Sequence, residues 1–271
     1  MTAGRAGRRI GSIVLEIWLV VALVVLWWWL SAGSRSTFFP PLSAIVSRTG
    51  QLWVFDHTVS DLLPSLANLL AGFAIAFVLG VALGLLLAAS PRLLTAIEPE
   101  LEFLRAIPAV ALIPVAIIAL GLGDGMRIAI IAFGALWPIL LNTIAGARSL
   151  DPVARDVGAA FGLNRTTRIF AVRLPAAAPQ ILAGARTSLS IAVVLVVVSE
   201  ISGATRGVGF FVLAAQRNYA ITNMWTGMIV LGIVGYALNL LFRVVESQVL
   251  HWHPTYRSRT PAVTRPASAG R

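Results

Sequence analysis

The sequence predicts an all-α membrane protein with about six transmembrane helices and both termini in the cytoplasm. Of its 271 residues, 58% are hydrophobic and only 12% are charged, which is not the composition of a soluble globular domain. A helix needs about 20 apolar residues to cross roughly 30 Å of hydrocarbon, so uncharged stretches of that length can be counted directly. About six such stretches occur, separated by segments that contain arginine, proline and glycine.

The expected spans follow one another along most of the chain, at about 13–30, 66–89, 106–122, 128–147, 187–203 and 224–242. The first could also be a signal peptide, but it ends in three consecutive tryptophans, which suit an interfacial anchor better than a cleavage site. In the third, Pro108 and Pro114 each lack a backbone donor and should kink or break the helix. The tail after Leu250 has no apolar period and is expected to be disordered.

Arginine predicts the orientation of these spans. With the N-terminus inside, 16 of the 21 basic residues, all of them arginine, fall in inner segments, because the outer segments hold only Arg35, Arg48, Arg127, Arg206 and Arg217. Basic residues accumulate on the cytoplasmic side, so both termini and the segment 151–180 are expected there. Arg127, Arg206 and Arg217 are expected to be solvated at the outer rim, with contact to an anion or an acidic binding protein as the alternative.

Composition excludes several chemistries. The chain has no lysine, so it lacks the GxxxxGK phosphate loop and cannot form a Schiff base. It has no cysteine, which removes disulfides, thiolate metal sites and thiol nucleophiles. The net charge of +10 does not indicate nucleic acid, because a basic balance in so apolar a chain reflects orientation in a membrane. His251 and His253 lack further ligand candidates nearby, so we expect interfacial anchors and no metal site.

Small residues and one acid stand out within the expected spans. Gly80 and Gly84 form a GxxxG pair with Gly72 two turns earlier, a spacing that lets another helix approach closely, either within the chain or across a dimer. Glu200 is the only acid well inside an expected span, and an intramembrane carboxylate is a candidate functional residue. The alternatives for Glu200 are direct contact with a substrate, a helix-positioning hydrogen bond, and a pair with Arg206.

The segment 151–180, DPVARDVGAAFGLNRTTRIFAVRLPAAAPQ, is polar and lies between two spans. Asp151 followed by proline is typical of a helix start, and Gly162 can end that helix. Asn164 can cap a second short helix, which Leu174-Pro175 should end. The apolar face of two such helices could lie on the membrane surface or dock on another protein, and composition leaves these alternatives even.

The spacing within this segment resembles the EAA loop of ABC-importer permeases. That pattern is an acidic and two small residues, three arbitrary residues, Gly, nine arbitrary residues and I-x-L-P; it corresponds here to Asp156-Val157-Gly158, Gly162 and Val172-Arg173-Leu174-Pro175. Val157 departs most, because it is β-branched where the family prefers small residues. The runs 104–115, 158–182 and 199–210 resemble the nitrate, sulfonate and taurine branch of these permeases, and the resemblance covers about 62–249.

The resemblance implies a type I ABC importer permease fold and a non-catalytic role. Two permease copies, expected to be a homodimer, would form the pore in the bacterial inner membrane, in contact with membrane lipid. Two partner ATP-binding subunits would bind ATP and Mg, whereas this chain would bind no cofactor, metal or nucleic acid. A periplasmic or lipid-anchored substrate-binding protein would deliver a small organic anion of the sulfonate, taurine or nitrate kind. The alternative is an ion-coupled secondary transporter or channel, which needs no EAA-like loop.

The same resemblance implies which residues dock on the ATP-binding subunit. Asp156 would make the polar contact, Gly162 would shape the turn, and Phe161 would add apolar contact. The complete expected docking set is Asp156, Val157, Gly158, Phe161, Gly162, Arg165, Arg168, Leu174 and Pro175.

Elsewhere the expected site residues are fewer, and the chain divides into three parts. Candidates for translocation or helix positioning are Glu200, Arg206, Pro108 and Pro114. The expected division is an N-terminal arm with the first span and an extracytoplasmic loop over 1–61, a permease core over 62–249 that contains the coupling loop 151–180, and a cytoplasmic tail over 250–271.

Overall fold

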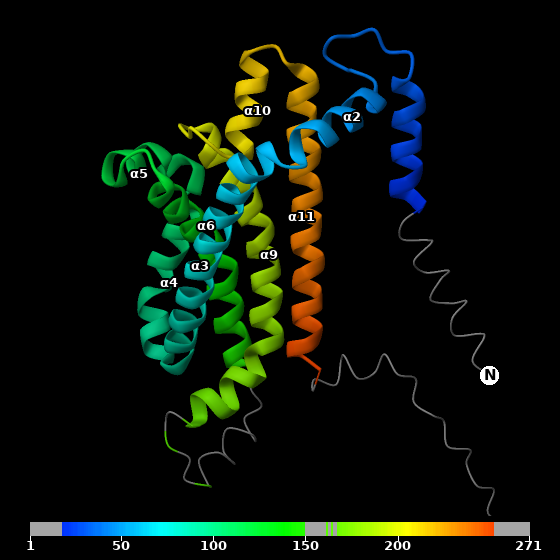
Figure 1. Cartoon of the computed structure of the whole chain (residues 1–271). Coiled ribbons are helices and arrows are strands. Elements are labelled where there is room, and N and C mark those ends of the chain that lie inside the picture. The colour runs from blue at the N-terminus through cyan, green and yellow to red at the C-terminus, as the bar shows by residue number, and fades with distance from the viewer. Residues whose placement is uncertain (1–17, 150–160, 162–163, 165–166, 252–271) are drawn as a thin grey trace, which may run out of the picture. The chain divides into compact units, whose positions relative to one another are not determined.

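The computed structural model describes residues 18–149, 161, 164 and 167–251. Every regular element in this described part is a helix, which confirms the predicted all-α class (Figure 1). The chain divides into two compact units. The smaller unit comprises Met1–Pro64 and Thr205–Gly232, and the larger unit comprises Ser65–Ala204 and Ile233–Arg271.

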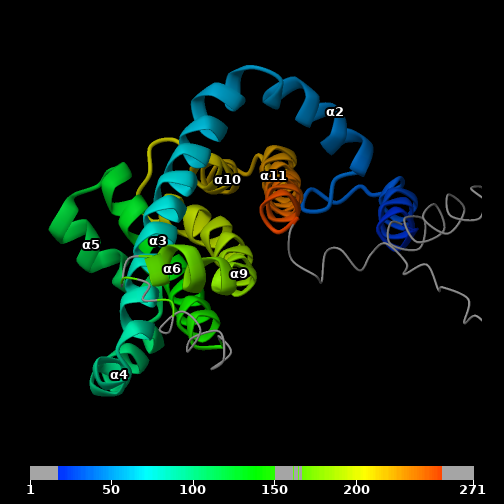
Figure 2. The same ribbon diagram turned by 90° about the horizontal axis from the view of Figure 1, so that it is seen from below.

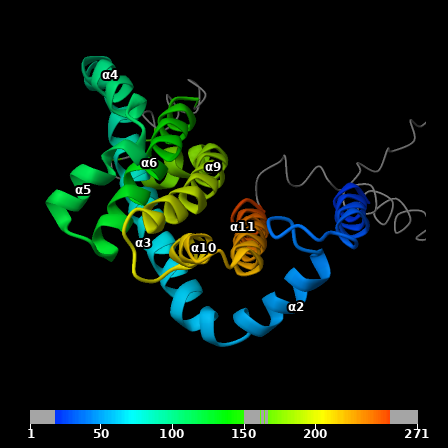
Figure 3. The same cartoon turned by 90° about the horizontal axis from the view of Figure 1, so that it is seen from above.

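The larger unit is built around three long helices, α3 (Leu63–Ala89), α6 (Asp124–Arg148) and α9 (Leu174–Ile201). They lie side by side in both end-on views (Figure 2 and Figure 3). Their facing side chains form the main core, with Ala76 of α3, Ile131 and Ile139 of α6 and Ala192 of α9 fully or almost fully buried. The second half of α11 (Ile221–Val249) adds Leu238 and Phe242 to the edge of this core.

The predicted small-residue stripe packs within the chain. A Cβ atom added at Gly80 would lie 2.8 Å from Ile139 Cγ2, and one at Gly84 would lie 2.6 Å from Thr143 Cβ. Gly72 meets Ile131 of the same helix, α6, in the same way. Glycine at these positions lets α3 and α6 approach more closely than any side chain would allow. Of the two alternatives for the GxxxG pair, the structure therefore shows the intrachain one.

The smaller unit holds the helix Trp18–Ser31, α2 (Leu42–Trp53), η1 (Thr58–Leu62), α10 (Val208–Arg217) and the start of α11. Trp53 connects several of them. Its indole Nε1 donates a hydrogen bond to Thr226 Oγ1 at 3.0 Å, and its ring centroid lies 5.0 Å from that of Phe211 in an edge-on arrangement. The polar end of the indole is thus paired while its apolar body is buried, as tryptophan requires.

Within the described residues, four helices are long and apolar enough to cross a membrane: Thr58–Ala89, Asp124–Arg148, Ile169–Ile201 and Ile221–Val249. They correspond to the second, fourth, fifth and sixth predicted spans. The first predicted span is described only from residue 18, as the apolar helix Trp18–Ser31, which is shorter than a span. Its start and the predicted disordered tail, from residue 252, lie outside the described residues.

The bounds of the third predicted span are wrong. Residues 91–120 form a pair of helical segments, Pro91–Ala106 (α4) and Ala109–Leu120, bent by 81°. Pro108 is the N-cap of the 3₁₀ turn η2 (Ala109–Leu112), and Pro114 lies in the first turn of α5 (Ile113–Leu120), so the predicted break by proline is confirmed. The eight residues of α5 extend only about 12 Å, so this helix is too short to cross a membrane alone. Because α4 contains three glutamates, the search for uncharged stretches did not assign it to the third span.

Leu174-Pro175 does not end a helix, contrary to the prediction. Instead the π-helical turn η3 (Arg168–Arg173) runs directly into α9, just as η1 runs into α3 at Leu63-Pro64. A proline ring clashes with the carbonyl four residues earlier and leaves that carbonyl without its donor. A wider π turn before each proline accommodates both effects, so the helix continues through the proline.

Candidate functional site

The described ends of the coupling loop lie together at one end of the larger unit. The C-terminal end of α6 and the N-terminal end of η3 are there, beside the turn between α3 and α4 (Figure 1). Asn164 Oδ1 accepts a hydrogen bond from the Thr167 backbone N–H at 2.7 Å, which confirms the predicted cap. Phe161 is 79% exposed. The loop therefore presents an aromatic side chain that the described residues do not cover.

Most of the expected docking set lies outside the described residues. These are Asp156, Val157, Gly158, Gly162 and Arg165, and of Arg168 only the backbone, the first residue of η3, is described. Leu174 and Pro175 form the first turn of α9, where both are partly buried. Leu174 packs on a small apolar cluster that includes Leu85, Ala147 and Ile181.

The two helices that flank the loop are in very close contact. A Cβ atom added at Gly184 of α9 would lie 2.6 Å from the Pro138 carbonyl oxygen of α6, and one at Gly146 of α6 would lie 2.8 Å from Gln180 Cβ. Higher up, the Ser188 hydroxyl donates to the Ala135 carbonyl at 2.6 Å in a buried position. With backbone so close to backbone, α6 and α9 have little freedom to slide past one another. A force applied to the loop would move them as a pair.

A second feature is a polar cluster at the start of α3, made of Ser65, Asn68, Asp124, Arg127 and Glu200. The Ser65 hydroxyl donates to Glu200 Oε1 at 2.6 Å, and Asn68 Nδ2 donates to Asp124 Oδ1 at 3.1 Å. Ser65 and Asn68 are three residues apart, hence on one face of α3. One turn of α3 therefore binds α9 through Glu200 and α6 through Asp124.

Arg127 completes this cluster, and the prediction that it is a solvated arginine is wrong. Its Nη1 donates to Asp124 Oδ1 at 2.5 Å, and the residue is only 4% exposed, so it is not a solvated rim arginine. Its Nε has no hydrogen-bond partner among the described residues. Burial of a guanidinium requires a charged partner, which Asp124, one turn earlier on the same helix, supplies. Arg206 and Arg217 are exposed, and their place at the outer rim stays a prediction.

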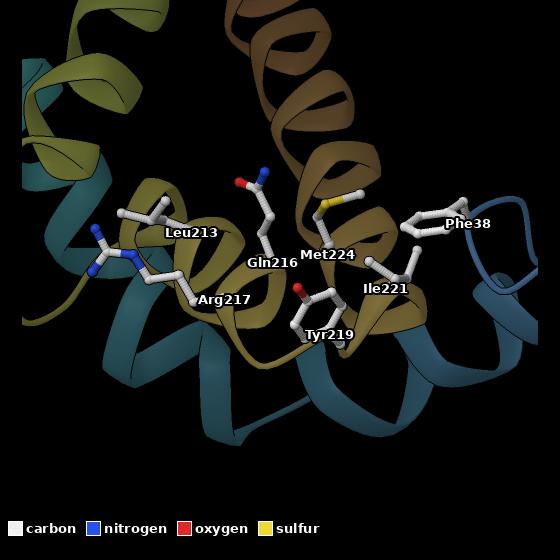
Figure 4. A pocket seen from close by; sticks show the side chains of 7 residues that line it. All are labelled: Phe38, Leu213, Gln216, Arg217, Tyr219, Ile221 and Met224. Carbon is white, nitrogen blue, oxygen red and sulfur yellow. The ribbon is translucent and has the colours of Figure 1, made fainter.

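Arg217 borders a hollow of about 520 Å³ in the smaller unit, where α10 turns into α11. Figure 4 shows its side chain pointing away from the apolar side of the hollow, formed by Phe38, Ile221 and Met224. Gln216 points between the two helices. The hollow thus offers an apolar wall with one amide, and the guanidinium lies at its margin.

The start of α10 in the smaller unit is held by Asp61. The Gly207 backbone N–H donates to Asp61 Oδ1 at 3.0 Å, while the Ser60 hydroxyl and His57 Nδ1 each lie 2.7 Å from Asp61 Oδ2. A carboxylate at the N-terminal end of a helix is favourable because unpaired N–H groups gather there. Asp61 therefore fixes η1 to α10.

Sequence reasoning missed Ser65, Asn68, Asp124 and Asp61, as well as Glu246 of α11, which is buried against Arg186 of α9. The apolar pattern of the last span continues past Arg243, and that continuation would have placed Glu246 inside the helix. No comparable signal marks Ser65 or Asn68, because hydroxyl and amide residues at the start of a helix are common.

Comparison with known proteins identifies the fold and the function. The family described as "Binding-protein-dependent transport system inner membrane component" matches residues 76–248. This chain belongs to that family. It is a multi-pass permease of the bacterial inner membrane and a subunit of an ATP-driven ABC importer, a transport component rather than an enzyme. Binding-protein-dependent transport implies a substrate-binding protein and ATP-binding subunits as partners.

Relatives place the chain in the nitrate, sulfonate and taurine branch. It is 30% identical over 250 residues to the putative aliphatic sulfonates transport permease protein SsuC of Bacillus subtilis, covering 92% of this chain and 88% of the relative. It is 30% identical over 240 residues to the nitrate import permease protein NrtB of Synechocystis sp., covering 85% and 87%. The taurine transport system permease protein TauC of Escherichia coli is 27% identical over 249 residues, covering 89% and 90%.

A solved structure shares the fold. A chain of the inward-facing MetNI methionine ABC transporter superimposes with a TM-score of 0.62 at 21% identity, covering 70% of this chain and 94% of that one. The fold is therefore that of an ABC importer permease, as the resemblance of the segment 151–180 implied.

Proposed function

We propose that this permease pairs with a second copy of itself to form the pore for a small organic anion. The support is that similar permeases are named for aliphatic sulfonates, nitrate and taurine, all of them small anionic or zwitterionic solutes. The binding protein, periplasmic or lipid-anchored, would select the substrate. Both ATP-binding subunits would hold ATP and Mg, because a chain without lysine has no GxxxxGK phosphate loop of its own.

The segment 151–180 would dock on the ATP-binding subunit and drive the pore. The observation that carries this proposal is the close packing of α6 and α9, the two helices that the segment connects, at Gly146 and Gly184. Two helices in backbone contact transmit a displacement without absorbing it by side-chain rearrangement. The spacing from Asp156 to Pro175 and the exposed Phe161 agree with a docking loop.

Within the loop, Asp156 would make the polar contact and Gly162 would shape the turn between two short helices. Val157, Gly158 and Phe161 would supply apolar contact. Arg165 and Arg168 would lie at the charged rim. Both termini would face the cytoplasm, since the excess of arginine falls in the segments that the predicted spans place on the same side as the loop, where Arg92, Arg148 and Arg173 lie. The proposed core, 62–249, includes the whole family match.

Bulky substitutions in the loop test this docking. Gly162→Trp and Asp156→Trp should each weaken co-isolation of the ATP-binding subunit by about tenfold or more, because loss of one well-packed contact of 1.4 kcal/mol has that effect. Binding-protein-stimulated ATP hydrolysis should fall with it. Gly33→Trp is the matched control, because a Cβ atom at Gly33 meets nothing within 4 Å.

Unchanged association and unchanged hydrolysis in both loop variants would rule out docking through 151–180. Uptake driven by a proton or sodium gradient, by this chain without an ATP-binding subunit, would instead favour the secondary-transporter alternative.

A further inference from the structure

An ion pair joins α9 to the C-terminal part of α11 in the larger unit. Arg186 Nη2 donates to Glu246 Oε2. The Glu246 side chain is 7% exposed and that of Arg186 is 45% exposed. A buried carboxylate is stable only when charged or hydrogen-bonding partners offset its lost hydration. Arg186 is such a partner, so this contact fixes the position of Glu246, and with it the end of α11, relative to α9.

The apolar packing of α11 in the larger unit is light. Only 6% of its apolar window is buried, against 50% for the span that contains α9. A Cβ atom at Gly235 would be 3.5 Å from Val193 Cγ1, an ordinary contact, and Phe242 meets Phe73 edge-on with centroids 6.4 Å apart. This differs from the α6–α9 contact, where backbone atoms meet. Packing alone would let α11 lag behind when α9 moves.

We propose that Arg186 and Glu246 are positioning residues that make α11 follow α9 during the transport cycle. The inference rests on the proposed docking of the segment 151–180, which enters α9 through η3. Arg186 lies 12 residues after Leu174, on the order of 18 Å along a continuous helix, so a displacement of the loop reaches it undiminished. Since Glu246 is bound to Arg186, the displacement passes to α11 at this level.

Absence of cysteine allows a direct test with single reporters. Ala183→Cys on α9 and Ser247→Cys on α11 are both exposed positions, and each would be introduced separately into the assembled importer. The measurement is the rate of reaction with a membrane-permeant maleimide, with and without trapping by ATP and vanadate. In the parent protein both rates should change on trapping. With Glu246→Leu, which removes the acceptor for Arg186, the change at residue 183 should persist and that at residue 247 should shrink by about fivefold or more, the lower end of typical couplings.

Three controls separate this role from a structural one. Glu246→Leu removes the carboxylate that accepts from Arg186, and this half-exposed arginine can be hydrated, so the complex should still assemble and co-isolate with its ATP-binding subunit. Arg186→Glu combined with Glu246→Arg should restore the change at residue 247. Arg243→Gln, one turn away on an exposed face of α11, should alter neither reporter.

A full response at residue 247 in Glu246→Leu, or failure of the charge exchange to restore it, would overturn the proposal. If the reaction rate at residue 183 does not change on trapping even when Arg186 and Glu246 are both present, the docking of the loop is contradicted instead. The two failures are therefore distinguishable.

Discussion

At the residue scale, the informative side chains are polar groups buried between helices. Glu200 is 1% exposed and accepts a hydrogen bond from Ser65, so it joins α9 to α3. This geometry agrees with the helix-positioning alternative, whereas substrate contact and pairing with Arg206 stay predictions. Asp124 does the same for α6 through Asn68, with Arg127 as its charged partner. Each carboxylate accepts a hydrogen bond from a polar side chain of α3.

The Ser65–Glu200 hydrogen bond should contribute to the stability of the protein. Glu200→Leu should destabilise the protein by about 1–3 kcal/mol, because the Ser65 hydroxyl then loses a buried acceptor. Glu200→Gln should cost less, since its amide oxygen can still accept. Adding Ser65→Ala to Glu200→Leu should recover part of the loss. Thermal unfolding of the detergent-solubilised complex measures all three.

Simple additivity of Ser65→Ala and Glu200→Leu would show that the two side chains are not coupled. A Glu200→Gln variant that keeps its melting temperature but loses binding-protein-dependent ATP hydrolysis would point to substrate contact instead.

At the element scale, glycine determines which helices move together. Gly72, Gly80 and Gly84 bring α3 against α6, and Gly146 and Gly184 bring α6 against α9. Proline sets the remaining geometry: Pro108 breaks the third membrane segment, while Pro175 is accommodated by the π turn η3 without ending the helix. The helices that flank the coupling loop are thus continuous and closely packed.

Gly184 is the position where the close packing of α6 and α9 can be tested most directly. Gly184→Ala would place a Cβ atom 2.6 Å from a backbone carbonyl of α6, which cannot rotate away. Separation of the two helices should cost about 1–3 kcal/mol and reduce the coupling of ATP hydrolysis to transport. Gly50→Ala on α2 is the control, because its Cβ meets nothing within 4 Å. It should be neutral or stabilise by roughly 0.5–1 kcal/mol. Equal melting temperatures for both variants would contradict the close-packing argument.

At the scale of the whole molecule, orientation decides what each end of the bundle can meet. The excess of arginine at the loop end predicts that this end is cytoplasmic. The predicted order of the spans along the chain would then put the segment between α10 and α11 on the outer side, where the binding protein arrives. Because the family requires such a protein, the outward face must remain accessible to it.

Labelling of introduced cysteines tests the predicted orientation. Asn218→Cys, between α10 and α11, should react in intact cells with a membrane-impermeant maleimide. Ser268→Cys, in the tail, should react only after the inner membrane is permeabilised. The parent chain has no cysteine and should not react at all. Labelling of residue 268 in intact cells would reverse the proposed topology.

Apolar length, proline and the spacing of the segment 151–180 are local properties of the chain, so they predicted the membrane class, four of the spans, the proline break and the family. Only the tertiary structure showed that Gly80 and Gly84 face α6, that Arg127 is buried, and that Glu246 meets Arg186. Such contacts join residues far apart in the sequence, 60 positions for Arg186 and Glu246 and 135 for Ser65 and Glu200. Periodicity tells which face of a helix is apolar or polar, but not which other helix covers it.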